Sequence, residues 1–313
     1  MIKYSIRRIL LTIPLLLVVL SLVFVFVRLA PGDPAMAILG QYATQESLDA
    51  LREDMGLNAP MWLQYLRFLG NLLRGELGES MLNGVPVVDQ LRVVLPYTLE
   101  LTFSGMFLGI ILGVPLGVYT ALRRNQRADY SGRVVSLAGI SIPSFFLGIL
   151  LLYVFSVRMD LFPVLGGGRE GDLGDRIYHL VLPTLSLGLI MTSYIMRMTR
   201  SSMLNVLNED FVRTAKSKGL RERVVVYKHA FMNALIPVVS VLGIYFIINL
   251  GSSIMTEIVF SRPGLGKLMV LAMKQRDYVV LQSVMLNYAT LANFINLFVD
   301  LVYGLIDPRI KYG

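Results

Sequence analysis

The sequence predicts an all-α, polytopic membrane protein with six transmembrane helices and both termini in the cytoplasm. Of its 313 residues, 55% are hydrophobic and only 16% are charged, whereas an average soluble domain has roughly 25% charged residues. The mean hydropathy is +0.64. The chain has no cysteine, which excludes disulfides, thiolate nucleophiles and thiolate metal sites.

Six apolar runs have the length that a membrane crossing needs. A helix rises ~1.5 Å per residue, so roughly 20 apolar residues cross ~30 Å of hydrocarbon. The predicted spans are Ile9–Val27, Leu101–Leu122, Val134–Val157, Leu180–Met196 with an extension back to Ile177, Ala230–Thr256, and Val279–Val299 with an extension to Ile306. The first run has 19 residues, longer than the usual 7–15 of a signal peptide, so we interpret it as a retained span.

The basic residues indicate the orientation of these spans. They precede the first span, join the second to the third and the fourth to the fifth, and close the chain, and these segments hold more than half of the 29 Lys and Arg residues. Loops rich in Lys and Arg stay in the cytoplasm, and an even number of spans places both termini there. The formal charge of +8 therefore reflects membrane topology and not nucleic-acid binding.

This topology divides the chain into three expected parts. Residues 1–30 form an N-terminal tail and the first span, and residues 31–96 form an external segment. Residues 97–313 form a five-helix core with a cytoplasmic loop at 200–229.

The external segment contains two predicted helices. Glu46–Met55 reads as a helix that ends at Gly56, and Pro60 suits the first residue of the next helix. In that second helix the apolar residues recur at helical spacing and form one stripe, which comprises Trp62, Tyr65, Leu66, Leu69 and Leu73. We expect the stripe to lie on the outer membrane face or to pack on neighbouring spans.

Glycine and proline mark the second and third spans. The second span carries Gly105, Gly109, Gly113 and Gly117, and small residues one turn apart let another helix approach closely. Pro115 and Pro143 are expected to kink or loosen their helices. Carboxylates are rare in the spans, and those of Glu100, Glu257 and Asp300 are expected near span ends, where they can reach lipid headgroups.

The loop between the fourth and fifth spans predicts a short cytoplasmic helix near Glu209–Gly219. Acidic residues begin it and Gly219 is placed where it should stop. An apolar stripe, formed by Phe211, Val212, Ala215 and Leu220, lies beside many cations. We expect this stripe to need a partner chain, and the alternative is a basic helix that rests on anionic headgroups.

At this loop the chain resembles the integral-membrane permease subunits of ABC importers, in the branch that takes up dipeptides, oligopeptides and nickel. The hallmark motif is the run Arg213-Thr214-Ala215-Lys216-Ser217-Lys218-Gly219, followed by Leu235-Ile236-Pro237. Further matches are Arg7-Arg8-Ile9, Pro31-Gly32-Asp33-Pro34-Ala35, Gly56-Leu57, Gln64-Tyr65, Pro96-Tyr97-Thr98-Leu99-Glu100, Arg262-Pro263-Gly264-Leu265-Gly266, Arg276-Asp277-Tyr278 and Asp307-Pro308-Arg309.

The resemblance implies a multi-pass subunit of a bacterial inner membrane that forms the pathway of a short-peptide importer. It implies a heterodimer with a second permease, two ATP-binding subunits that hold ATP and Mg²⁺, and an external solute-binding protein. It also assigns an ATPase-coupling site to Arg213, Thr214, Ala215, Lys216 and Gly219, and an external gate loop to Arg262, Pro263, Gly264 and Gly266. The same architecture could import nickel or glutathione-type cargo.

The residue inventory argues against other functions for this chain. Gly264-Leu265-Gly266-Lys267 resembles part of a phosphate-binding loop, but Leu268 replaces the Ser or Thr that reaches magnesium. The two histidines, His179 and His229, fall on opposite membrane faces, so neither a metal site nor a hydrolytic centre is expected. We therefore expect no cofactor on this chain and no enzyme activity, and an ion-coupled secondary carrier is a weaker alternative because mid-membrane ionisable residues and an inverted repeat are not visible.

Overall fold

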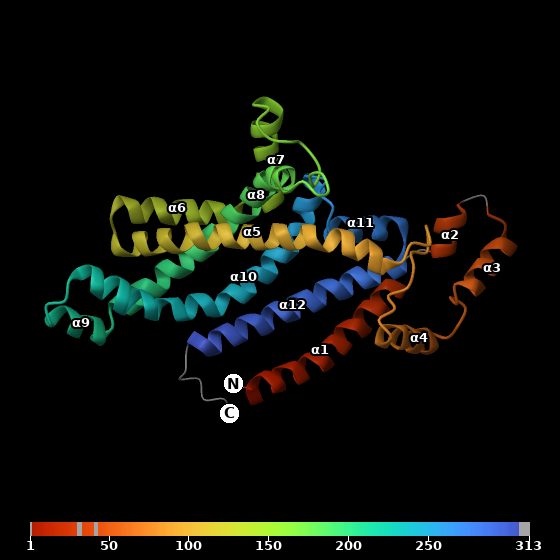
Figure 1. The fold of residues 1–313 in the computed structure, drawn as a ribbon, viewed down its shortest axis with the longest axis horizontal. Coiled ribbons are helices and arrows are strands. Elements are labelled where there is room, and N and C mark those ends of the chain that lie inside the picture. The colour runs from red at the N-terminus through yellow and green to blue at the C-terminus, as the bar shows by residue number, and fades with distance from the viewer. Residues whose placement is uncertain (1, 30–32, 41–42, 307–313) are drawn as a thin grey trace. The chain divides into compact units, whose positions relative to one another are not determined.

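The computed structural model describes residues 2–29, 33–40 and 43–306, and its ordered elements are helices apart from one isolated bridge between Glu79 and Pro86 (Figure 1). The chain divides into two compact units, which are described separately. Unit 1 comprises Met1–Ser5, Thr98–Arg262 and Phe294–Gly313, and unit 2 comprises Ile6–Tyr97 and Pro263–Asn293. Pro31, Gly32 and the motif at 307–309 lie outside the described residues.

Within the described residues, five helices are long and apolar enough to cross a membrane. They are α1 (Ile2–Leu29), α5 (Val87–Leu122), α8 (Leu173–Leu207), the π-helix η2 (Val224–Phe231) continued by α10 (Met232–Val259), and α12 (Tyr278–Ile306). Each contains one of the predicted spans. A bent pair makes a sixth if it is counted as one span, so the predicted all-α polytopic fold is confirmed.

The third predicted span is not a straight helix. α6 (Arg127–Ser141) and the following α7 (Ser144–Leu151) with η1 (Leu152–Arg158) meet at 98° (Figure 1). Ile142 is extended because the ring of Pro143 disfavours a helical residue before it, and Pro143 becomes the N-cap of α7. The predicted kink at Pro143 is therefore a full break, whereas α5 continues through Pro115 to Leu122.

The four glycines of α5 form the packing face that their spacing predicts, and α8 fills it. A β-carbon at Gly109 would lie 2.6 Å from the β-carbon of Met191, and one at Gly113 would lie 2.9 Å from the backbone oxygen of Thr192. Such distances are shorter than real contacts of a β-carbon. The two helices of unit 1 therefore approach closely because these positions carry no side chain.

Replacing Gly117 by alanine is expected to destabilise unit 1. The new β-carbon would lie 2.7 Å from the carbonyl oxygen of Met196, a backbone atom that cannot move without displacing α8. Overpacking of this kind costs about 1–3 kcal/mol, so the thermal midpoint of the purified protein in detergent should fall. Gly251→Ala on α10 is the matched control, since nothing lies within 4 Å of its new methyl group. Equal midpoints for the two variants would contradict this packing.

In unit 2, three helices follow α1: α2 (Pro34–Leu39), α3 (Gln45–Asp54) and α4 (Met61–Leu73). They agree with the two predicted helices and add α2. Asp33 caps α2 through the backbone N–H of Ala35 and pairs with Arg52 of α3 at 2.5 Å. Desolvation opposes the ionisation of Asp33, but the hydrogen bonds from Arg52 and Ala35 outweigh it and hold its pKa below the usual value.

The apolar stripe predicted on α4 has two destinations. Tyr65 packs edge-on against Phe24 of α1 with ring centroids 5.2 Å apart, and its hydroxyl lies 2.6 Å from that of Ser21. Trp62, Leu66 and Leu73 are exposed. One side of the stripe thus packs on a neighbouring span, and the other side is available to lipid.

Candidate functional site

The predicted cytoplasmic helix is present as α9 (Asp210–Ser217), between α8 and η2 in unit 1. Glu209 is its N-cap, Asp210 lies in its first turn and Lys216 in its last turn. Acidic residues at the start and a basic residue at the end both favour the helix dipole, so this short sequence is helical for local reasons. α9 lies at the same end of unit 1 as the connection between α5 and α6 (Figure 1).

The inner side of α9 is buried against its own chain. The side chain of Val212 is fully buried and that of Ala215 is nearly so. Their hydrophobic cluster contains Val118 and Ala121 of α5, Met203 of α8, Val225, Val226 and Ala230 of η2, and Ala234 of α10. The expectation that the apolar stripe needs a partner chain is therefore wrong for Val212 and Ala215, which fix α9 to the ends of three long helices.

The outer side of α9 carries the rest of the stripe and the cations. Phe211 is 42% exposed and Leu220 is 41% exposed. Arg213, Thr214 and Lys216 are also exposed. Arg213 makes an exposed ion pair with Asp210 at 3.5 Å, which contributes little to stability. This surface therefore combines an aromatic ring with exposed positive charge.

Gly219 ends α9 in the way that the sequence predicts. Its φ is +73°, in the left-handed region, and its N–H donates to the carbonyl oxygen of Lys216 at 2.9 Å. The N–H of Leu220 donates to the carbonyl oxygen of Ala215 at 3.4 Å. These two bonds form a Schellman motif, which requires a residue that tolerates positive φ.

Two substitutions of Gly219 distinguish the effect of the backbone conformation at this position from the effect of side-chain size. No atom lies within 4 Å of a β-carbon built there, so a side chain has room but must adopt positive φ. In the transport function that the resemblance implies, Gly219→Val should lower uptake by roughly tenfold, because a β-branched residue is strongly disfavoured in this region. Gly219→Asn should keep most of the uptake, since Asn tolerates this conformation. Equal uptake by the two variants, at equal membrane abundance, would contradict the role of this turn.

An ionic cluster around the buried Arg262 joins α5, α8 and the end of α10 in unit 1. Arg262 is 0% exposed, and its Nη2 donates to Glu100 Oε2 on α5 at 2.8 Å. Arg176 of α8 donates to the other oxygen of the same carboxylate. Thr98 donates to Glu257 Oε1 of α10 at 2.6 Å, and both of these side chains are fully buried.

These contacts correct and extend the sequence analysis. Glu257 does not reach headgroups, because its carboxylate is buried and accepts a hydrogen bond from Thr98. The pairing of Glu100 with Arg176 and Arg262 was not predicted. The signal that could have indicated it is the carboxylate that ends the motif at 96–100, because charges within spans are rare and are usually paired.

The other residues of the predicted gate loop belong to unit 2. Gly264 is the N-cap of α11 (Leu265–Gln275), and its carbonyl oxygen accepts from the N–H of Leu268 at 3.0 Å. Pro263 is partly buried and Gly266 is buried. Leu265 is fully buried in the core of unit 2, which fixes the start of α11.

A second ion pair, also not predicted, connects α6 to α8 in unit 1. Asp129 is fully buried and accepts two hydrogen bonds from Arg200, at 2.6 and 2.9 Å. The N–H of Asn125 donates to the same carboxylate at 2.9 Å. This bidentate pair holds the first turn of α6 on the part of α8 that leads to α9.

Among the described residues, no group of three or more His, Cys, Asp or Glu side chains could hold a metal ion. His179 faces Asp175 on its own helix, with its Nδ1 2.9 Å from the carbonyl oxygen of that residue. α9 and the two ionic clusters are therefore the candidate functional features of unit 1.

The chain matches two related families over most of its length. Residues 113–312 match the family described as "Binding-protein-dependent transport system inner membrane component". Residues 1–102 match the N-terminal family of the same membrane components. Together these ranges include both ionic clusters, α9 and the loop that begins at Arg262.

Relatives match the chain over its full length. The dipeptide transport system permease protein DppB of Alkalihalophilus pseudofirmus is 40% identical, and the alignment covers 100% of both chains. The glutathione transport system permease proteins GsiC of Pectobacterium atrosepticum and of Escherichia coli K12 are 41% and 40% identical, also with full coverage of both chains.

A solved structure shares the fold. Inward facing conformations of the MetNI methionine ABC transporter match with a TM-score of 0.57 and 20% identity, over 70% of this chain and 96% of that chain. At this identity the likeness concerns the fold alone. The family matches and the full-length relatives show that the chain is an inner membrane permease component of a binding-protein-dependent transport system.

Proposed function

We propose that this chain, as a permease subunit of an ABC importer, forms a pathway for short peptides together with a second, different permease. Two ATP-binding subunits would hold ATP and Mg²⁺, and an external solute-binding protein would deliver the cargo. The names of the relatives support this cargo class, since they include a dipeptide permease and glutathione permeases. Glutathione is itself a short peptide, and a nickel complex is the alternative cargo.

The observation that carries the proposal is the two-sided construction of α9. Its inner side is packed on the ends of α5, α8 and α10 through Val212 and Ala215, and its outer side presents Phe211 and cations. A force applied to the outer side therefore reaches three long helices through a close-packed cluster. A contact of this kind suits an ATPase cleft that is apolar at its centre and acidic at its rim.

The site residues have different roles in this proposal. Arg213, Thr214 and Lys216 contact the ATPase, Ala215 seats α9 on the spans, and Gly219 turns the chain away from it. Coupling must be reciprocal: if ATP changes the access of cargo to the pathway, cargo delivery changes ATP turnover.

The same proposal places both termini and α9 in the cytoplasm. The excess of Lys and Arg in the loops supports this orientation, with the bent pair α6 and α7–η1 counted as one crossing. Residues 1–30 then contain the first span, 31–96 an external segment, and 97–313 the core with its coupling loop at 200–229. Arg262, Pro263, Gly264 and Gly266 form an external element near the mouth, where Arg262 anchors the loop through Glu100.

The test is uptake of a labelled dipeptide by cells that carry the complete transporter. Adjacent reading frames should encode the second permease, the ATPases and the binding protein. We expect uptake that needs all of these genes and continues when an ionophore removes the ion gradients. Uptake by this chain alone, abolished by the ionophore, would instead indicate a secondary carrier.

A further inference from the structure

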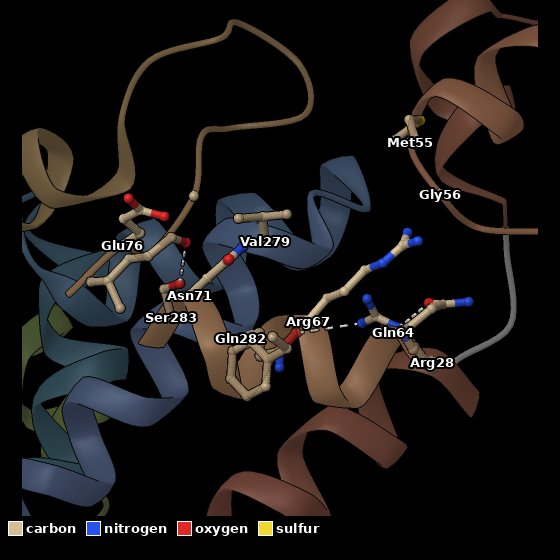
Figure 2. Close-up of a pocket in the computed structure, with 13 residues that line it drawn as sticks. Arg28, Met55, Gly56, Gln64, Arg67, Asn71, Glu76, Val279, Gln282 and Ser283 are labelled. Carbon is tan, nitrogen blue, oxygen red and sulfur yellow. Dashed lines mark hydrogen bonds between the residues drawn. The ribbon is translucent and has the colours of Figure 1, made fainter. Parts of the chain in front are cut away.

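Unit 2 contains a polar pocket that the proposed coupling does not use. Its volume is about 210 Å³, and it is formed by the end of α1, one face of α4, the start of α12 and the segment around Glu76 (Figure 2). In the proposed topology, the end of α1 and the start of α12 face the outside of the cell. The pocket is therefore on the side from which cargo arrives.

Two guanidinium groups lie in one part of the pocket, and neither has an acidic partner in the described part of the chain. Arg28 donates to Gln64 Oε1 at 2.8 Å and to Gln282 Oε1 at 3.4 Å, both uncharged acceptors. Its guanidinium also lies 4.2 Å from the centre of the Phe24 ring. Arg67 extends toward Gly56 and lines the same part of the pocket (Figure 2).

The positive charge of Arg28 is therefore held in place but not neutralised. A half-buried guanidinium that is oriented by neutral groups is well suited to bind a carboxylate, because little side-chain freedom is lost when the ligand arrives. The second guanidinium at Arg67 can complete a two-sided clamp.

The other side of the pocket has the opposite charge. The view in Figure 2 shows Glu76 away from the two guanidiniums, with Asn71 and Ser283 near it. The described residues provide no ion-pair partner for the carboxylate of Glu76. The hydroxyl of Ser283 donates to the carbonyl oxygen of Leu77 at 3.2 Å, which fixes the chain next to Glu76.

We propose that this pocket binds a short peptide with free termini. Its carboxylate would contact Arg28 and Arg67, and its ammonium group would contact Glu76. This inference rests on the proposed peptide cargo and adds a site on the permease itself. The volume is below the roughly 300–1,000 Å³ of sites for drug-sized ligands, so a dipeptide is the expected size class. An anionic lipid headgroup is a poorer ligand for this pocket than a peptide. It has no cationic group for Glu76, and its negative charge would face that carboxylate.

The test measures equilibrium binding of labelled Ala-Ala to the complete transporter in lipid nanodiscs, without the external binding protein. Ala-Ala amide and N-acetyl-Ala-Ala are the comparison ligands, since each lacks one of the two charges. We expect saturable binding of Ala-Ala that is at least roughly tenfold weaker for each comparison ligand, because one charge-assisted contact is lost.

Variants at exposed positions assign the contacts without disturbing the core. Arg67→Gln should weaken binding of Ala-Ala by roughly tenfold but leave binding of the amide unchanged. Glu76→Gln should remove the preference for a free amino terminus. Arg74→Gln and Glu79→Gln are matched controls, since these exposed residues do not line the pocket.

Peptide uptake by the complete transporter, measured in parallel, keeps the two proposals distinguishable. If uptake is normal but Ala-Ala does not bind in the nanodiscs, or if Arg67→Gln and Arg74→Gln bind equally well, the pocket proposal is wrong and the transport function stands. If the transporter takes up no peptide at all, the proposed function is wrong and the pocket proposal falls with it.

Discussion

Ala215→Asp is expected to abolish ATP-driven uptake while the permease remains inserted in the membrane. The substitution places a carboxylate in the apolar cluster between α9 and the ends of the spans. An unpaired charge in such a place costs several kcal/mol, so α9 should separate from the cluster. Uptake should fall by more than roughly tenfold, measured together with membrane abundance and ATPase activity.

The matched control is Ala215→Ser. A serine hydroxyl is small and can donate to the carbonyl oxygen one turn earlier, so this variant should transport almost normally. Wild-type uptake by Ala215→Asp would show that the seating of α9 is not needed for coupling. Loss of the permease from the membrane would show instead that α9 is part of the folding core.

Arg262→Met is the second substitution with a large expected effect, this time on stability. It removes the buried partner of Glu100 while keeping an unbranched side chain of similar reach. Breaking a buried ion pair costs about 3–5 kcal/mol. We expect about 3 kcal/mol here, since Glu100 keeps its contact with Arg176 and is partly exposed.

A double-mutant cycle with Glu100→Gln isolates the ion pair. The double variant should be less destabilised than the sum of the two single variants, because neither partner is then left behind. The free energy of unfolding in mixed detergent provides the measurement. Strict additivity would contradict an interaction between these two side chains.

Much of the fold followed from patterns that depend on local sequence. The spans follow from the length of apolar runs, and the close contact of α5 with α8 follows from glycines spaced one turn apart. The start and end of α9 follow from its acidic first turn and from Gly219. Each of these signals acts through neighbouring residues, so it can be read without tertiary structure.

The remaining features depend on contacts between distant segments. The sequence marks Pro143 as a site of bending, but the 98° angle also depends on what α7 packs against. From the sequence alone, Val212 and Ala215 form an exposed apolar edge of a short helix. The structure buries both residues against the end of α5 and against η2. The same holds for Arg262 and Glu100, which are 162 residues apart in the chain.

The outer side of α9 is the proposed contact with the ATPase, and photo-cross-linking reports on that contact. A benzoylphenylalanine introduced at Phe211 should cross-link to an ATPase subunit in the assembled transporter. The same group at Phe103, an exposed aromatic position within α5, serves as the control and should not. If position 211 forms no cross-link in a complex that still contains the ATPases, α9 is not the contact.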